Sequence, residues 1–152
     1  MGMYYSLRCK LKLKQEFIPQ IDSLLNDADA EWSNITDIES IKDYSTDSRS
    51  SFIPFGVLAY SPDNWDDEPW RNEIEDDIWT FQCSVKTSST IRSFFKNVVP
   101  VISEKSLHIE YFYEENDFAD LYELRDGAVV ATGEKIKYGY KDEDPWRLVQ
   151  IE

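Results

Sequence analysis

The sequence predicts a single α+β domain built on an antiparallel sheet, and three observations predict it. Several short segments alternate apolar and polar side chains with period 2, which is typical of half-buried strands. Two segments between them repeat apolar residues every three to four positions, as amphipathic helices do. The chain has 152 residues, 41% of them hydrophobic, so residues 1–152 suit one domain.

The N-terminal segment predicts a strand and then a short helix. From Tyr5 to Leu13 the odd positions are apolar or aromatic and the even positions are polar. Apolar residues then recur at helical spacing between residues 16 and 28, with Pro19 expected in the first turn. Residues 34–51 are rich in Ser, Thr and Asp and predict a connection with one or two helical turns.

Two further strands are predicted in the middle of the chain. The apolar run Phe52–Tyr60 predicts the first of them, and Pro54 and Gly56 favour an edge position for it. Between residues 79 and 85, Trp, Phe, Cys and Val alternate with polar residues, which predicts the second.

The strongest helical pattern follows. Apolar residues between Ile91 and Ile102 fall at i, i+3, i+4, i+7, i+8 and i+11. The Thr/Ser cluster at residues 87–90 supplies an N-cap for this helix, and Pro100 is expected to kink or end it.

A strand and a hairpin complete the pattern. Residues 107–113 alternate, and residues 118–125 lead through Asp126-Gly127 into Ala-Val-Val-Ala, which is typical of a hairpin whose second half extends to about Tyr140. The order of elements predicts a ferredoxin-like β-α-β-β-α-β fold with an antiparallel sheet, helices on one face and an added C-terminal β-hairpin.

Two passages also resemble a known family. They are IWTFQCSVKTSSTIRSFFKNVVPVI, and IEYFYEENDFADLYELRDGAVV, in which an aromatic strand leads through an acidic turn into Tyr-x-x-x-Asp-Gly. Over about residues 75–130 the chain resembles the YubB-type ferredoxin-like domain proteins of bacteria and phages. The resemblance implies the same fold and assigns no activity.

The charge of the chain restricts the kind of partner it can bind. With 30 acidic and 16 basic residues, the formal net charge is -14 at pH 7. This charge disfavours direct binding to nucleic acid or to an anionic membrane and favours a cationic partner. No apolar run is long enough to span a bilayer, and the N-terminus alternates where a signal peptide would be continuously apolar, so we expect a cytoplasmic protein.

The sequence offers little for catalysis, metals or cofactors. His108 is the single histidine, Cys9 and Cys83 share the apolar parity of their strands, and the glycines form no phosphate-binding loop. The acids at 63–68 lack the spacing of a calcium loop. We therefore expect no enzyme, cofactor or metal site, and two buried thiols without a disulfide; an enzyme that uses carboxylates or a metal is kept as a third hypothesis.

Four basic side chains share one face of the first predicted strand: Arg8, Lys10, Lys12 and Lys14. In a ferredoxin-like order this strand is central, so Glu110 and Glu114 on a neighbouring strand can pair across with the lysines and balance the charge internally. Contact with an acidic ligand or RNA is the alternative.

The candidate binding segment is DNWDDEPWRNEIEDD at residues 63–77, one of three acidic blocks. Tryptophans among carboxylates are typical of an interface, where the rings anchor and the acids steer a basic partner. Alternatively, Trp65 and Trp70 fold back onto the core and the acids only keep the chain in solution. The candidate partner-binding residues are Asp63, Trp65, Asp66, Asp67, Glu68, Trp70, Glu75, Asp76 and Asp77.

These features together predict a non-enzymatic inhibitor that covers a basic or nucleic-acid-handling surface of another protein. A toxin or nuclease-like effector would be such a partner, as for toxin-immunity or phage anti-defence proteins, and the chain would be a monomer or a homodimer. The alternative is a small-ligand or peptide binding module on the open sheet face. That module would use Tyr111, Tyr113 or Phe112 with the lysines of the first strand.

Overall fold

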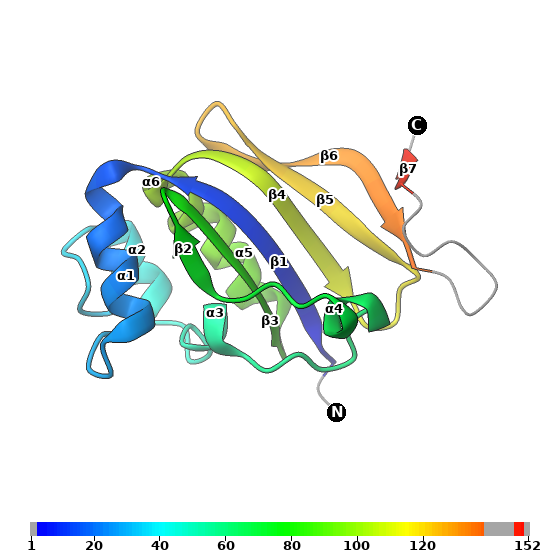
Figure 1. The fold of residues 1–152 in the computed structure, drawn as a ribbon, viewed down its shortest axis with the longest axis horizontal. Helices are drawn as coiled ribbons and strands as arrows, with labels where there is room; N and C mark the ends of the chain where they lie inside the picture. The colour runs from blue at the N-terminus through cyan, green and yellow to red at the C-terminus, as the bar shows by residue number, and fades with distance from the viewer. Residues whose placement is uncertain (1–2, 139–147, 151–152) are drawn as a thin grey trace.

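The computed structural model describes residues 3–138 and 148–150, which form an α+β fold with an open antiparallel sheet (Figure 1). The strands are β1 (Tyr5–Leu13), β2 (Glu73–Glu75), β3 (Ile78–Val85), β4 (Ser103–Tyr113), β5 (Phe118–Arg125), β6 (Ala128–Lys137) and β7 (Leu148–Gln150). The helices are α1 (Ile18–Asn26), α2 (Glu39–Ser45), α3 (Phe52–Phe55), α4 (Asp63–Asp67), α5 (Ser88–Asn97) and α6 (Val99–Ile102). The strand order is β2-β3-β1-β4-β5-β6-β7, and each neighbouring pair is antiparallel.

The central strand β1 pairs with β3 on one side and with β4 on the other. Its odd positions Leu7, Cys9, Leu11 and Leu13 are fully buried in the main core, which lies between the sheet and the helices. Its even positions point to the opposite face, because successive side chains of a strand alternate. The predicted alternation of this strand is therefore confirmed.

Aromatic side chains from distant parts of the chain fill the main core. The Phe94 ring of α5 lies 5.6 Å from Tyr44 of α2, 5.9 Å from Trp32 and 6.0 Å from Phe81 of β3, measured between ring centroids. Trp32 Nε1 donates a hydrogen bond to the carbonyl oxygen of Ile53 at 2.6 Å, so the connection between α1 and α2 is held against α3. These contacts fix the helices on one face of the sheet.

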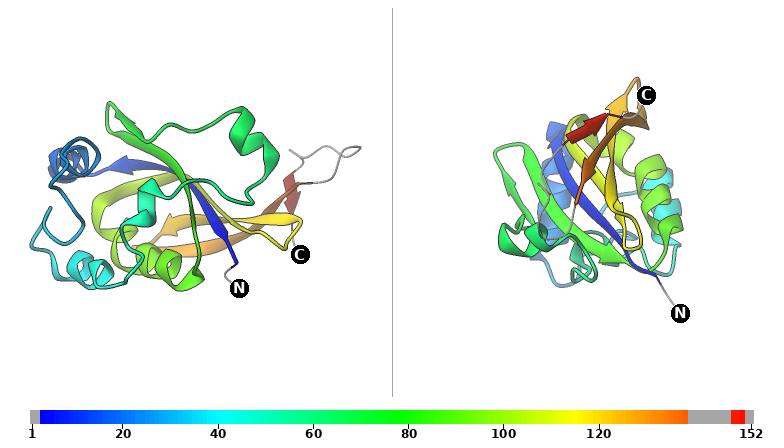
Figure 2. Two further views of the ribbon diagram at one scale, coloured as in Figure 1. Left: turned by 90° about the horizontal axis from the view of Figure 1, so that it is seen from below. Right: turned by 90° about the vertical axis from the view of Figure 1, so that its right-hand side faces the viewer.

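The sheet has a second covered face. Figure 2 shows α2 and α5 on one side of the sheet and α4 on the other. The segment around α4 packs on the face to which the even positions of β1 point. The sequence predicted that this face is open, whereas the structure shows it partly covered.

The predicted strand at 52–60 is wrong. Residues 52–55 form the short element α3, in which the buried residues Ile53 and Pro54 depart from helical φ/ψ, and no strand follows it between residue 56 and β2. The chain then passes so close to β3 that a Cβ atom on Gly56 would lie 2.2 Å from the carbonyl oxygen of Ser84. The periodicity of an apolar run of this length does not show whether the run forms a buried strand or another short buried element. In this protein, the packing of the run against β3 determines its conformation.

The strand at the sheet edge is β2 instead, within the acidic stretch. It pairs with β3 through a tight turn in which Asp76 has a φ of 59°. Three residues with a glutamate at each end carry no periodic signal, so the sequence did not predict this strand.

Other predicted elements are confirmed with adjusted bounds. The Thr87 side chain accepts a hydrogen bond from the Ser89 backbone at 3.2 Å and caps α5, and the helix breaks into α5 and α6 before Pro100. Asp126 and Gly127 both have positive φ in the β5–β6 hairpin, as its tight turn requires. The predicted end of that hairpin, at Tyr140, lies outside the described residues.

Both cysteines are buried free thiols, as expected. Burial raises the pKa of Cys9 and of Cys83, so neither has the character of a reactive thiolate. Within residues 3–138 and 148–150, no helix has the length and apolar character that crossing a membrane requires.

Candidate protein-interaction surface

The segment that contains α4 is fixed to the sheet by Trp65. This side chain is fully buried and packs on Phe112 of β4 and Ala119 of β5, with Leu58 and Tyr138 around it. These residues form a second, smaller core on the face opposite to the main helices. Of the two interpretations of Trp65, the structure supports the one in which the ring folds back, because a buried ring is not available to a partner.

Arg8 of β1 also binds the segment that contains α4. Its guanidinium carbon lies 5.0 Å from the Trp65 ring centroid and 4.4 Å from the Trp70 ring centroid, so two indoles flank one cation. Arg8 Nη2 donates to the Glu68 carbonyl oxygen at 2.7 Å, and Nε donates to Gln82 Oε1 at 3.0 Å. Burial lowers the pKa of Arg8, and the nearby Glu110 opposes this shift.

Glu110 is the buried counter-charge of Arg8. The two residues are opposite each other in the β1–β4 register, and Glu110 is 2% exposed. The His108 ring nitrogen lies 2.8 Å from Glu110 Oε1, and the Tyr138 hydroxyl donates to Glu110 Oε2. Tyr138 also accepts a hydrogen bond from Trp65 Nε1 at 3.1 Å.

This polar chain satisfies the buried carboxylate. Burial raises the pKa of Tyr138, and the Glu110 carboxylate raises it further, so the phenol stays protonated and donates. The sequence did not predict Tyr138 as part of the site. Its role depends on the end of β6 lying close to Trp65 and Glu110, and no local sequence pattern predicts that contact.

The basic stripe of β1 is balanced largely within the protein. Lys12 lies 3.3 Å from Glu104 and 3.8 Å from Asp77, and Lys10 lies 5.0 Å from the Trp70 ring centroid. The predicted role of Glu114 is wrong, since its carboxylate accepts a hydrogen bond from the Tyr4 backbone instead. Glu110 lies opposite Arg8 and not opposite a lysine, and Lys12 pairs with Glu104 and Asp77, so the acids beside the stripe differ from the predicted lysine partners Glu110 and Glu114.

The acids around α4 and β2 face solvent. We use the name acidic strip for the exposed carboxylates of residues 63–76: Asp63, Asp66, Asp67, Glu68, Glu73, Glu75 and Asp76. Asp77 is partly buried and pairs with Lys12. Among the described residues, no member of the strip makes an ion pair, so its negative charge is left for solvent or for a partner. Glu73 was absent from the predicted set, although its place in the acidic run was a usable signal.

Trp70 differs from Trp65 because it is only partly buried. Its ring packs edge-on against His108, with 5.2 Å between ring centroids, and lies above Arg8 and Lys10. Part of the ring therefore stays exposed at the margin of the acidic strip. His108 is a hydrogen-bonded strand residue, and no group of three or more metal-ligating side chains occurs in the part of the chain that the structure describes.

The predicted alternative site does not assemble. Tyr111 is in register with Leu7 and Tyr113 with Tyr5, so both tyrosines share the helix-side face with the odd positions of β1. The lysines of β1 point to the other face, where Phe112 is buried under Trp65.

Comparison of the chain with protein-family models, with curated proteins and with solved structures finds no match. The function is therefore inferred from the geometry of this surface. That geometry consists of a band of exposed carboxylates, one partly exposed indole at its margin, and a buried cation that fixes the band to the sheet.

Proposed function

We propose that this chain is a non-enzymatic binding protein whose acidic strip covers a basic surface of a partner protein. A partner that handles nucleic acid, such as a toxin or a nuclease-like effector, presents such a surface, so a toxin-immunity or phage anti-defence role fits the charge. The observation that carries the proposal is the position of seven exposed carboxylates, none in an ion pair with any residue that the structure describes, on and beside a segment fixed by Trp65 and Arg8.

Fixing the acids before binding has a physical benefit. Like charges held close together repel each other and lower the stability of the free protein, and a basic partner relieves this repulsion. A fixed segment also loses less conformational entropy on binding than a flexible one. The charge of the strip accelerates the encounter with a basic surface, and the exposed part of Trp70 can add apolar contact.

We also propose a more specific fold class than an α+β fold with an open antiparallel sheet. We infer a ferredoxin-like arrangement from the sheet order β2-β3-β1-β4, in which α1 and α5 fall in the two connections between strands, with the β5–β6 hairpin added. Likeness to the YubB-type proteins is part of the same proposal.

The test combines identification of a partner with matched charge variants. Affinity capture from host lysate at low and then moderate salt identifies basic proteins that bind stoichiometrically, and association rates are then measured with the purified partner. The variant D66N/D67N/E75Q removes three charges from the strip, and D29N/D43N/E39Q removes three from exposed sites on and around α2.

We expect the strip variant to slow association about tenfold or more at low salt, and the control to slow it much less. Equal effects of the two variants would show attraction by net charge alone and would contradict the proposed surface. Failure to capture any basic partner would argue against the function itself.

A further inference from the structure

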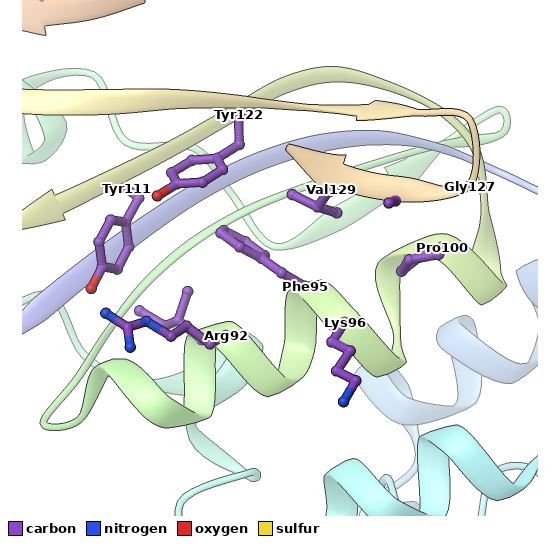
Figure 3. A pocket seen from close by; sticks show the side chains of 10 residues that line it. Arg92, Phe95, Lys96, Pro100, Tyr111, Tyr122, Gly127 and Val129 are labelled. Carbon is purple, nitrogen blue, oxygen red and sulfur yellow. The ribbon is translucent and has the colours of Figure 1, made fainter. Parts of the chain in front are cut away.

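A second site lies on the helix side of the sheet, away from the acidic strip. There a pocket of about 480 Å³ opens between α5 and the strands β4, β5 and β6 (Figure 3). Pockets that hold small organic ligands have volumes of roughly 300–1,000 Å³. The pocket forms because the sheet continues past β4 while α5 and α6 cover only part of that face.

Aromatic rings form the wall of this pocket. The Phe95 ring of α5 lies 5.1 Å from the Tyr122 ring of β5, and Tyr122 lies 6.1 Å from Tyr111 of β4, measured between centroids. Val129 of β6 continues the apolar surface on the other side of Phe95, as Figure 3 shows. An apolar ring bound here would contact aromatic and aliphatic groups together.

The charge of the pocket is opposite to that of the protein. Arg92 and Lys96, one turn apart on α5, line it, and none of the acidic residues that the structure describes does. Neither cation makes an ion pair among residues 3–138 and 148–150. In Figure 3 the Arg92 guanidinium lies near the Tyr111 hydroxyl, whereas the Lys96 side chain extends away from the two tyrosines.

The two phenols are hydrogen-bond donors at neutral pH. Burial raises the pKa of Tyr111 to about 12, and burial together with the Asp120 carboxylate raises the pKa of Tyr122, while the positive charge of Arg92 acts in the opposite direction on both. One end of the pocket thus combines a guanidinium with the protonated Tyr111 hydroxyl, and Tyr122, Phe95 and Val129 line the rest.

We propose that this pocket binds a small aromatic carboxylate, with its carboxylate at Arg92 and Tyr111 and its ring against Phe95, Tyr122 and Val129. The planar guanidinium fork matches the geometry of a carboxylate. A ligand with one negative charge is favoured over a nucleotide or a longer polyanion, because the chain already has a net charge of -14 and repels multiple charges.

The test is a titration of the full chain with 2-naphthoate, followed by amide chemical shifts in NMR spectra. The neutral 2-naphthamide tests the need for the carboxylate. The variant R92Q removes the cation of the pocket, and R71Q removes an exposed arginine on the opposite face with the same change in net charge. The variant V129W fills the pocket without changing the charge.

We expect saturable shifts confined to α5 and β4–β6 at millimolar or lower ligand concentration. The dissociation constant should rise about tenfold or more in R92Q and in V129W, should change little in R71Q, and 2-naphthamide should bind about tenfold more weakly. Absence of saturable shifts, or equal losses in R92Q and R71Q, would overturn the proposal. Because the acidic strip lies on the other face, this result is independent of the partner-binding test.

Discussion

The Arg8 guanidinium carbon lies 4.4 Å from the centroid of the Trp70 ring, on the face of the sheet that the main helices leave uncovered. Arg8 is 5% exposed, and Trp65 flanks it on its other side. A surface segment rich in acids is thus joined to the central strand through a buried cation.

We expect Arg8→Met to lower the free energy of unfolding by about 3 kcal/mol or more, because it leaves Glu110 buried without its counter-charge and removes the hydrogen bond to the Glu68 carbonyl. Urea denaturation measures the change. Lys86→Met is the control, since Lys86 also lies over an aromatic ring, that of Tyr4, but is exposed. A loss of less than about 1 kcal/mol in both variants would contradict the proposed attachment.

Tyr138 makes the stability of the protein depend on pH in the alkaline range. Its folded-state pKa is raised above the ordinary value of 10, so its contribution to stability is complete below about pH 10 and falls as the pH rises toward the folded-state pKa. We expect Tyr138→Phe to weaken this fall by up to about 1.4 kcal/mol per pH unit above pH 10. Unfolding free energies at several pH values check this. Tyr60→Phe, at a residue 69% exposed, should leave the slope unchanged, and equal slopes in all three proteins would exclude the effect.

Gly56 is constrained by contact with β3. We expect Gly56→Ala to destabilise the protein by about 2 kcal/mol or more, because its Cβ would lie 2.2 Å from the Ser84 carbonyl oxygen and the backbone has to move. Gly127→Ala meets no atom within 4 Å but has a φ of +80°, so it should cost only about 1 kcal/mol. Thermal or urea unfolding compares the two. A smaller loss at Gly56 than at Gly127 would show that the segment after α3 is loosely held.

Repulsion within the acidic strip should be measurable without a partner. We expect D66N/D67N/E75Q to raise the melting temperature at low salt by about 2–4 °C, and added salt to reduce the difference between variant and wild type by screening the same repulsion. Calorimetry at two ionic strengths measures both effects. A melting temperature unchanged by the substitutions at low salt would show that the carboxylates do not interact.

The sequence predicted those elements whose cause is local. The alternation of β1 and β3, the cap and period of α5, and the Asp126-Gly127 turn are properties of a few consecutive residues. The apolar run at 52–60 was assigned to a strand because periodicity does not distinguish buried elements of that length. The strand β2 was missed because its three residues are too few to show a period-2 pattern, and the strand forms through its pairing with β3.

The sites were predicted less well, because they depend on contacts between distant residues. The acids of the strip could be identified from composition, whereas the burial of Trp65 depends on the path of its segment across β4 and β5. The pocket brings Arg92, Tyr111 and Tyr122 together only after the sheet has formed, and each of the three is unremarkable in its own segment.

Within the part of the chain that the structure describes, the small core under Trp65 shares no buried residue with the main core between the sheet and the helices. Because the two cores differ so much in size, they should unfold locally with different free energies. We expect amide hydrogens of residues 61–72 to exchange with solvent through local openings, and those of β1 to exchange only through global unfolding. We therefore expect substitutions of the exposed residues of this segment to leave the packing of the helices against the sheet unchanged.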